Sequence, residues 1–158
     1  MQENIESCKH HFIDSIFYEI ELTAKCTQML GRQAFEMYKI DISLEEVAIL
    51  DTIITNPNIC QRDIAKLILK DRANTGKLLD SLEKKGLIER KLDIKNNRPV
   101  KTAVITETGL KKFNEVSEKF RPHIEVVKDK IQNSDLNKLR DLLKEFREVL
   151  KNTLEIKI

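Results

Sequence analysis

The sequence predicts a mostly α-helical subunit with one small β-hairpin, in which a winged helix-turn-helix lies between N- and C-terminal helices. Three observations predict this fold class. Apolar residues recur at spacings of three and four over most of the chain, which is typical of amphipathic helices. Two short helical segments with a polar turn between them occupy residues 60–85, and a segment rich in β-branched residues follows. A chain of 158 residues is long enough for one compact subunit, which we divide into residues 1–42, 43–109 and 110–158.

The N-terminal part predicts one long amphipathic helix that runs from Ile5 to about Lys39. This segment contains no proline, and its apolar residues recur on one face. The residues that define this face are Ile13, Ile16, Phe17, Ile20 and Ala24.

A second helix is predicted to begin at the sequence SLEE. Ser43 and Glu46 match a capping box, in which the Ser hydroxyl accepts from the Glu amide and the Glu carboxylate accepts from the Ser amide. The helix should end before Pro57, because a residue that precedes proline avoids the helical conformation.

Residues 60–85 predict a helix-turn-helix. The first helix begins near Cys60 and is interrupted at Lys70. Asp71 is a good N-cap for the second helix, since its carboxylate lies near the positive end of that helix dipole. Gly86 can adopt the left-handed conformation that ends the second helix.

A two-stranded β-hairpin is predicted after Gly86. The segments LIERKLD and PVKTAVIT flank the sequence IKNNR, in which Asn96 and Asn97 tolerate the positive φ of tight turns. A helix-turn-helix followed by such a hairpin is a winged helix-turn-helix, with the hairpin as its wing.

The C-terminal part predicts two more helices. One begins at TETG and continues to Pro122, which should kink or divide it. The other begins at Ser134 and carries a broad apolar stripe, so we expect it to pack against a partner. The stripe consists of Leu136, Leu139, Leu142, Leu143, Phe146, Val149 and Leu150.

The basic residues are concentrated in the middle of the chain. The net charge of the whole chain is only +2, but residues 60–101 hold twelve Lys and Arg against six Asp and Glu, which gives +6. The first 59 residues hold four against ten, which gives −6. A local basic excess is typical of nucleic-acid binding, although a solvated lysine-rich face has the same composition.

The predicted positions of these residues favour double-stranded DNA as the partner. The second helix of the pair carries Arg72, Asn74, Thr75 and Lys77 in its first two turns, the part of such a helix that enters the major groove. Arg and Asn are the side chains that pair bidentately with guanine and adenine. The hairpin would place further cations along the DNA backbone or minor groove. The complete predicted DNA-binding set is Arg62, Arg72, Asn74, Thr75, Lys77, Lys95, Arg98 and Lys101.

Over nearly its whole length the chain resembles the MarR family of bacterial transcription regulators. The resemblance rests on CQRDIAKLI, DRANTGKLLDSLEKKGLIER and ITETG, in this order and spacing. Leu69 stands where the turn of the family often has Gly, and Gly76 stands where a polar residue is more common.

The resemblance implies a homodimer that binds a near-palindromic operator, usually as a repressor, and releases it when a small molecule or an oxidant acts. It also implies a dimerisation region built from both chain ends. The predicted dimer-interface residues are Ile13, Phe17, Leu139, Leu143, Phe146 and Leu150. The alternative function is a winged-helix module that binds protein rather than DNA.

Three cysteines offer alternatives that the sequence alone leaves open. Cys8 lies near His10 and His11, but the set is incomplete for a metal site and is expected to be an ordinary surface cluster. Cys26 lies on an apolar stripe and is expected to be a buried structural thiol. Cys60 occupies a predicted N-cap, where it is either a stand-in for Ser or a redox-active thiolate favoured by the helix dipole.

Other functional classes find no support in the sequence. No catalytic constellation and no phosphate-binding glycine loop is present, so neither an enzyme nor a cofactor is expected. The absence of a signal sequence, of a long apolar run and of a paired cysteine framework predicts a cytoplasmic protein without membrane partners.

Overall fold

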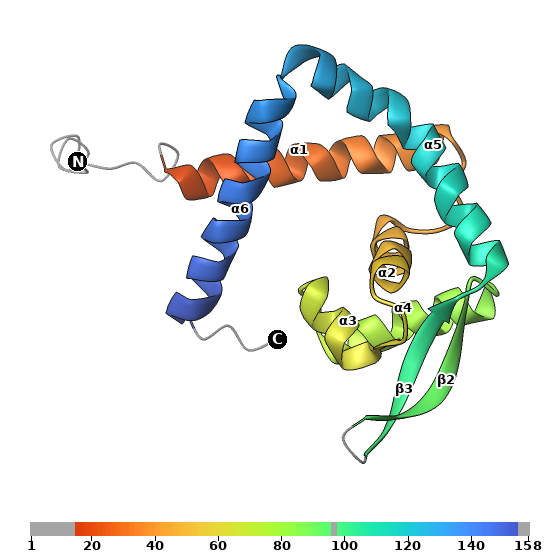
Figure 1. Ribbon diagram of the computed structural model, residues 1–158. Coiled ribbons are helices and arrows are strands. Elements are labelled where there is room, and N and C mark those ends of the chain that lie inside the picture. Colours follow the sequence, from red (N-terminus) through yellow and green to blue (C-terminus); the bar gives the residue numbers. More distant parts are fainter. Residues whose placement is uncertain (1–14, 96–97, 155–158) are drawn as a thin grey trace, which may run out of the picture. The chain divides into compact units, whose positions relative to one another are not determined.

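The computed structural model describes residues 15–95 and 98–154 (Figure 1). It confirms the mostly helical fold class with one small antiparallel sheet. The chain divides into two compact units, Met1–Asp41 and Ile42–Ile158, which we describe separately. In chain order the elements are α1 (Ile16–Met37), α2 (Leu44–Thr55), β1 (Ile59–Cys60), α3 (Gln61–Leu67), α4 (Arg72–Lys84), β2 (Ile88–Lys95), β3 (Arg98–Ile105), α5 (Glu107–Lys130) and α6 (Asn133–Leu154).

Helix α1 begins later than the sequence predicts. Ser15 has an extended backbone and its hydroxyl accepts from the Tyr18 amide at 3.3 Å, so Ser15 caps the helix and a continuous helix from Ile5 is wrong. The expected burial of Cys26 is also wrong, because this residue is exposed. Its stripe neighbours Leu22 and Met29 are exposed too. Helix α1 is the one element described in its unit, so no other element of that unit covers the stripe.

Helix α2 has the predicted ends. Ser43 and Glu46 make both hydrogen bonds of the capping box, at 3.1 and 2.7 Å. The helix ends at Thr55, two residues before Pro57. Its inner face supplies Ile49, Leu50 and Ile53 to the core.

The predicted helix-turn-helix is confirmed as α3 and α4. Cys60 and Asp71 are the N-caps of the two helices, and Gly86 has a φ of 69° just beyond the end of α4. Leu69 has a φ of 53°, so the turn keeps a left-handed residue although its sequence has no glycine there. A β-carbon disfavours that conformation, and the turn therefore contains local strain.

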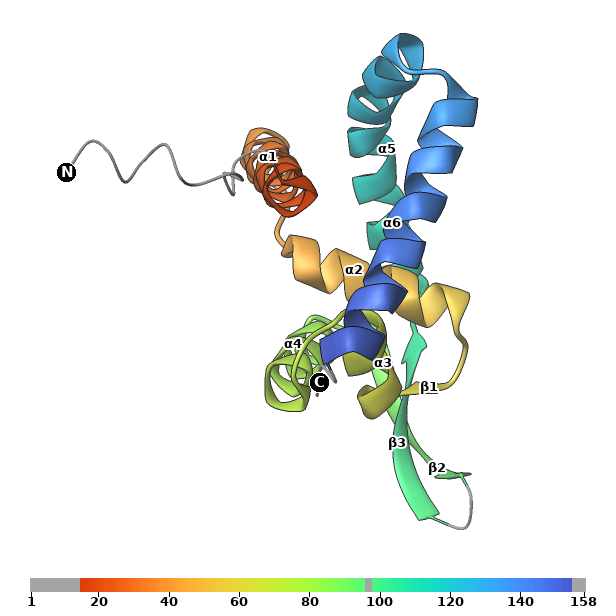
Figure 2. The same ribbon diagram turned by 90° about the vertical axis from the view of Figure 1, so that its left-hand side faces the viewer.

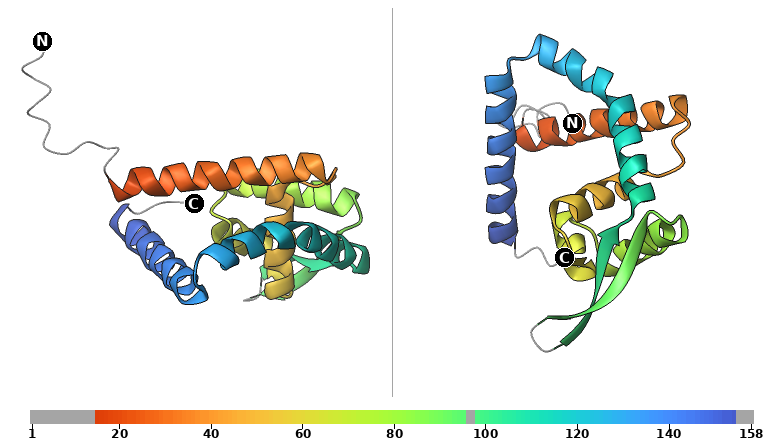
Figure 3. Two further views of the ribbon diagram at one scale, coloured as in Figure 1. Left: turned by 90° about the horizontal axis from the view of Figure 1, so that it is seen from above. Right: turned by 45° about the vertical axis from the view of Figure 1, so that its right-hand side comes forward.

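The wing is one part of a three-stranded antiparallel sheet with strand order β1-β3-β2. Strands β2 and β3 pair from Ile88↔Ile105 to Lys95↔Arg98, so both extend into the segment that the sequence predicts as a turn. The two-residue strand β1, which is too short to leave a sequence pattern, pairs Ile59 with Ala103. The distal end of the hairpin extends away from α2, α3 and α4 (Figures 2 and 3).

Helix α5 follows the wing directly. Thr106 caps it by accepting from the Gly109 amide at 3.0 Å, and the Thr106 hydroxyl donates to the Gly86 carbonyl at 2.7 Å. A β-carbon on Gly109 would lie 1.9 Å from the Leu87 carbonyl oxygen, so this position requires glycine. Helix α5 runs through Pro122 to Lys130, so of the two predicted effects, a kink or a division, the division is wrong.

The core of the second unit lies among α2, α3, α4 and the adjoining end of the sheet. Its most completely buried side chains come from all of these elements, so the position of each helix depends on the others. They are Ile49, Leu50, Ile53, Ile64, Thr75, Leu79, Leu82 and Ile88.

Candidate nucleic-acid interface

The two sides of α4 differ sharply in exposure. Its inner side buries Leu79 and Leu82, while Arg72, Asn74 and Lys77 are exposed near its beginning. Helix α4 is therefore held by its apolar side and presents the polar side of its first two turns to solvent.

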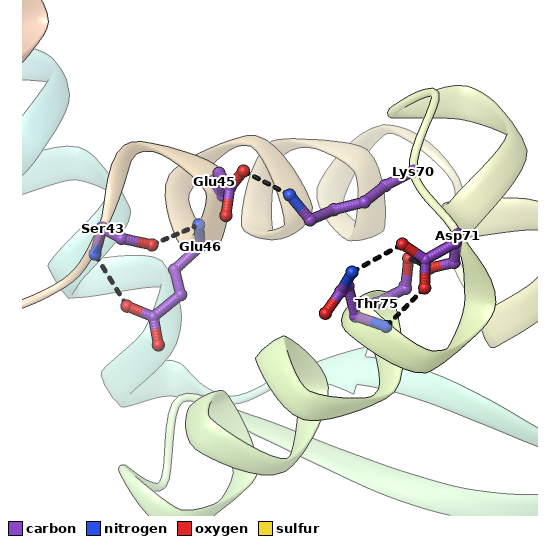
Figure 4. A network of polar contacts seen from close by, with 7 residues as sticks. Ser43, Glu45, Glu46, Lys70, Asp71 and Thr75 are labelled. Carbon is purple, nitrogen blue, oxygen red and sulfur yellow. Dashed lines mark hydrogen bonds and ion pairs between the residues drawn. The ribbon is translucent and has the colours of Figure 1, made fainter.

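Thr75 does not belong to this exposed set. Its side chain is fully buried, and its hydroxyl donates to the Asp71 carbonyl at 2.8 Å (Figure 4). Position 75 lies on the same side of the helix as Leu79, since residues four apart share a face. Thr75 therefore contributes to the core and does not lie on the exposed surface where the predicted DNA contact would need it.

Asp71 holds the start of α4 through two hydrogen bonds from Asn74. The Asn74 backbone amide donates at 2.8 Å and its side-chain amide donates at 2.6 Å. These bonds lower the pKa of the Asp71 carboxyl below its ordinary value. The Asn74 side chain is consequently oriented by the cap, with its carbonyl oxygen as the remaining acceptor group.

A buried carboxylate joins α2 to α4. Glu46 accepts from the Ser81 hydroxyl at 2.7 Å and from the Lys85 ammonium at 2.9 Å on each oxygen, in addition to its bond with the Ser43 amide. Burial raises the pKa of Glu46, but hydrogen bonds from Ser81, Lys85 and Ser43 outweigh burial and leave the pKa below its ordinary value. The charged carboxylate thus fixes the angle of α4 against α2.

Arg90 joins α4 to the wing. Its guanidinium donates to Glu83, with an Nε–Oε2 distance of 2.9 Å, and a terminal nitrogen lies 2.7 Å from an Asp80 oxygen. The hydrogen bond from Arg90 lowers the pKa of Glu83. A planar guanidinium can hold two carboxylates at once, so Arg90 sets the position of β2 relative to α4.

The predicted cations of the wing are only partly described. Lys101 is exposed on β3, opposite Leu92 of β2. Lys95 and Arg98 face each other in the register at the distal end of the hairpin, and their side chains lie outside the described part of the structure.

Arg62 is exposed on α3, as a DNA contact requires. Its side chain is 60% exposed, and its Nε lies 3.5 Å from an Asp63 oxygen. An exposed ion pair of this length is weak and leaves the guanidinium accessible to phosphate.

Cys60 has the capping position that the sequence predicts, but its thiol acts as a donor. Sγ donates to an Asp63 carboxylate oxygen at 3.0 Å, and the residue is buried. This hydrogen bond is the main cause of the lowered pKa of Asp63. A thiolate at Cys60 would face that carboxylate, so the geometry favours the structural alternative over a redox role.

Sequence reasoning missed Arg90 and the second role of Glu46. The capping box identified Glu46 as a cap, but its bond to Lys85 spans 39 residues and has no local signal. For Arg90 the sequence does contain a signal. Side chains alternate along a strand, so Arg90 lies on the same face as the buried Ile88, and a charge on a buried face needs partners.

The described residues also bear on metal binding and on membrane-spanning helices. Within 15–95 and 98–154, no group of three or more His, Cys, Asp or Glu is placed to hold a metal ion. Cys8, His10 and His11 lie outside those ranges. Among the helices that the structure describes, none is both long and apolar enough to cross a membrane.

Comparisons with known proteins agree with this geometry. The MarR family model matches residues 42–100. A curated relative, the uncharacterized HTH-type transcriptional regulator YybA of Bacillus subtilis (strain 168), is 28% identical over 101 residues. That alignment covers 64% of this chain and 65% of YybA, slightly less than two thirds of the relative.

Two solved structures share the fold. The MarR protein from Peptoclostridium difficile has a TM-score of 0.73 and 20% identity, and the match covers 91% of this chain and 93% of that chain. MepR of S. aureus, solved as a DNA complex, has a TM-score of 0.72 and 20% identity, and the match covers 89% of this chain and 99% of that chain.

The protein thus has a winged-helix fold, which it shares with these two solved structures. More particularly, residues 42–100 match the MarR family model, in agreement with the resemblance in the sequence motifs.

Proposed function

We propose that this protein is a sequence-specific DNA-binding regulator that acts as a homodimeric repressor. The observation that carries the proposal is the exposed start of α4, where Arg72, Asn74 and Lys77 are all exposed within the first two helical turns. This surface belongs to residues 60–101, which hold twelve basic and six acidic residues and so have a net charge of +6. The relative MepR has been solved with DNA on the same fold.

The dimer is proposed from the apolar stripe of α6. Leu139 and Leu142 are 52% and 53% exposed, and Leu143, Phe146 and Leu150 are half-buried. Covering these side chains would contribute roughly 1.5 to 3 kcal/mol for each one that becomes fully buried. From the N-terminal set, Phe17 is exposed on α1 and Ile13 lies outside the described residues.

A two-fold axis would place two copies of α4 on successive major grooves, so each half-site contact would count twice. The expected signal for release is a small molecule, because the buried thiol of Cys60 next to Asp63 is poorly suited to react with an oxidant. Peroxide tests this choice of signal. If peroxide releases the wild type from DNA but does not release Cys60→Ser, the signal is an oxidant that acts on Cys60.

The test is binding to duplex DNA from the region beside the gene for this protein, where an inverted repeat is first sought. Affinity should fall steeply with salt, because bound cations release the counterions of several phosphates. Arg72→Ala should lose discrimination at one base pair, worth about 1 to 3 kcal/mol, whereas Lys77→Ala should weaken all duplexes more evenly.

Lys138→Ala, a change of an exposed lysine on α6, is the matched control and should alter neither property. Binding that does not depend on salt, or no binding to any duplex, would favour the alternative of a protein-binding winged helix.

A further inference from the structure

The side chain of Gln61 lies across the beginning of α4. Gln61 belongs to α3, and its Nε2 donates to the Arg72 carbonyl at 3.0 Å in an exposed hydrogen bond. This bond holds the amide over the first turn of α4, next to the polar side that carries Arg72 and Lys77.

Gly76 makes the space that the Gln61 amide occupies. A β-carbon at position 76 would lie 3.0 Å from Nε2 of Gln61, 3.8 Å from its Cδ and 3.9 Å from its Oε1. A β-carbon at position 76 would therefore press on the Gln61 amide, which would have to shift by a few tenths of an ångström. The polar group at this place comes from α3, not from α4.

That place lies beside the proposed DNA surface. Arg72 and Gly76 are four residues apart and lie along the edge of the buried side that Thr75 and Leu79 define. Gly76 is half-buried and its neighbour Lys77 is exposed, so the Gln61 amide lies where the covered side of α4 meets its open side.

The amide keeps one donor and one acceptor in this position. Nε2 carries two hydrogens, of which the Arg72 carbonyl accepts one. Within the described residues no hydrogen bond uses Oε1. One N–H together with the carbonyl oxygen is the pattern with which Gln pairs bidentately with adenine in the major groove.

We propose that Gln61 reads an adenine in the operator, in place of a side chain at position 76. The proposal rests on the function proposed above, because it requires α4 to lie in the major groove. It assigns a base contact to α3, and it gives Gly76 the role of leaving room for that contact.

The experiment selects binding sites from a randomised duplex DNA pool with the full-length wild type, Gln61→Ala and Gly76→Ala. We expect the wild type to select an A·T pair at one position of each half-site. Gln61→Ala should lose that preference by about tenfold while keeping the rest of the consensus. Gly76→Ala should weaken the preference at the same position, because its methyl group makes the Gln61 amide shift by a few tenths of an ångström.

Thermal unfolding distinguishes a loss of base recognition from a loss of stability. Alanine is a better helix former than glycine, so Gly76→Ala should melt no earlier than the wild type although its selectivity is lower. Gln132→Ala changes an exposed glutamine outside α3 and α4, and as the matched control it should keep the wild-type consensus.

An unchanged consensus for Gln61→Ala would overturn the proposal and leave Gln61 a structural role. Equal weakening on every sequence, with a smaller salt dependence, would also overturn it in favour of a phosphate contact. If the wild type itself selects no sequence, the proposed function fails, and this proposal fails with it.

Discussion

The ammonium of Lys85 lies 2.9 Å from both carboxylate oxygens of Glu46, although 39 residues separate the two in the sequence. This pair joins the first turn of α2 to the end of α4 and is supported by the Ser81 hydroxyl. The interaction that orients the proposed recognition helix is therefore remote from the surface that the helix presents to DNA.

Glu46→Gln should lower the free energy of unfolding by about 1 to 3 kcal/mol. This loss is smaller than the loss expected when a fully buried ion pair is broken, because Lys85 is partly exposed. An amide has one acceptor oxygen, so a donor from Ser43, Ser81 or Lys85 would face its NH2 group. Urea unfolding measures the change. The double variant Glu46→Gln/Lys85→Met should lose less than the sum of the two single variants, and strict additivity would contradict the pairing.

Stability should fall in acid partly because of Glu46. Its folded pKa lies below the ordinary value of 4.5, so its contribution is complete above about pH 4.5 and is lost as the pH falls through the lower folded pKa. Melting temperatures measured from about pH 6 to pH 3 should decline less steeply in Glu46→Gln than in the wild type. The exposed Glu145→Gln is the control, and a similar flattening there would show that the effect is not specific to Glu46.

Arg90→Met should loosen the wing. The loss of its bonds to Glu83 and Asp80 should lower stability by about 1 kcal/mol, because both carboxylates are substantially exposed. Affinity for duplex DNA should fall as well, since the wing is no longer held against α4. Arg90→Lys keeps the charge but not the planar fork, so it should recover only part of the affinity. Full recovery by lysine would mean that charge alone matters.

Gly109→Ala should destabilise the protein by about 2 kcal/mol or more. The added methyl group would lie 1.9 Å from the Leu87 carbonyl oxygen, and backbone on one side must move to remove the clash. Chemical denaturation of this variant is best compared with Thr108→Ala, which changes an exposed neighbour and should have little effect. Equal stability of the two variants would show that the backbone at the start of α5 moves away from the Leu87 carbonyl without a loss of stability.

Leu143→Glu/Phe146→Glu should prevent dimer formation and abolish operator binding, although no residue of α4 or the wing has changed. Two buried charges without partners disfavour an apolar interface strongly. Light scattering and DNA titration measure the two outcomes. Lys144→Glu/Arg147→Glu, on the exposed polar side of α6, should remain dimeric. A dimer with wild-type operator affinity in the first variant would reject α6 as the interface.

Local patterns were sufficient to predict most elements of this protein. The sequence predicts the helix ends at Ser43, Asp71 and Gly86 because capping and positive φ depend on residues within a few positions of each other. The β-branched residues of the wing predict its strands in the same way. No local pattern predicts strand β1 or the continuity of α5 through Pro122, since packing against the rest of the chain decides both.

The side chains that hold or complete the candidate interface depended on tertiary structure. Sequence position placed Thr75 among the DNA contacts, but the packing of α4 turns it into the core. The bonds of Lys85 to Glu46 and of Gln61 to Arg72 join different helices, so no local periodicity encodes them. Sequence determines which residues share a helix, whereas the angle at which helices pack determines which side of each one remains exposed, because burial is a property of the whole chain.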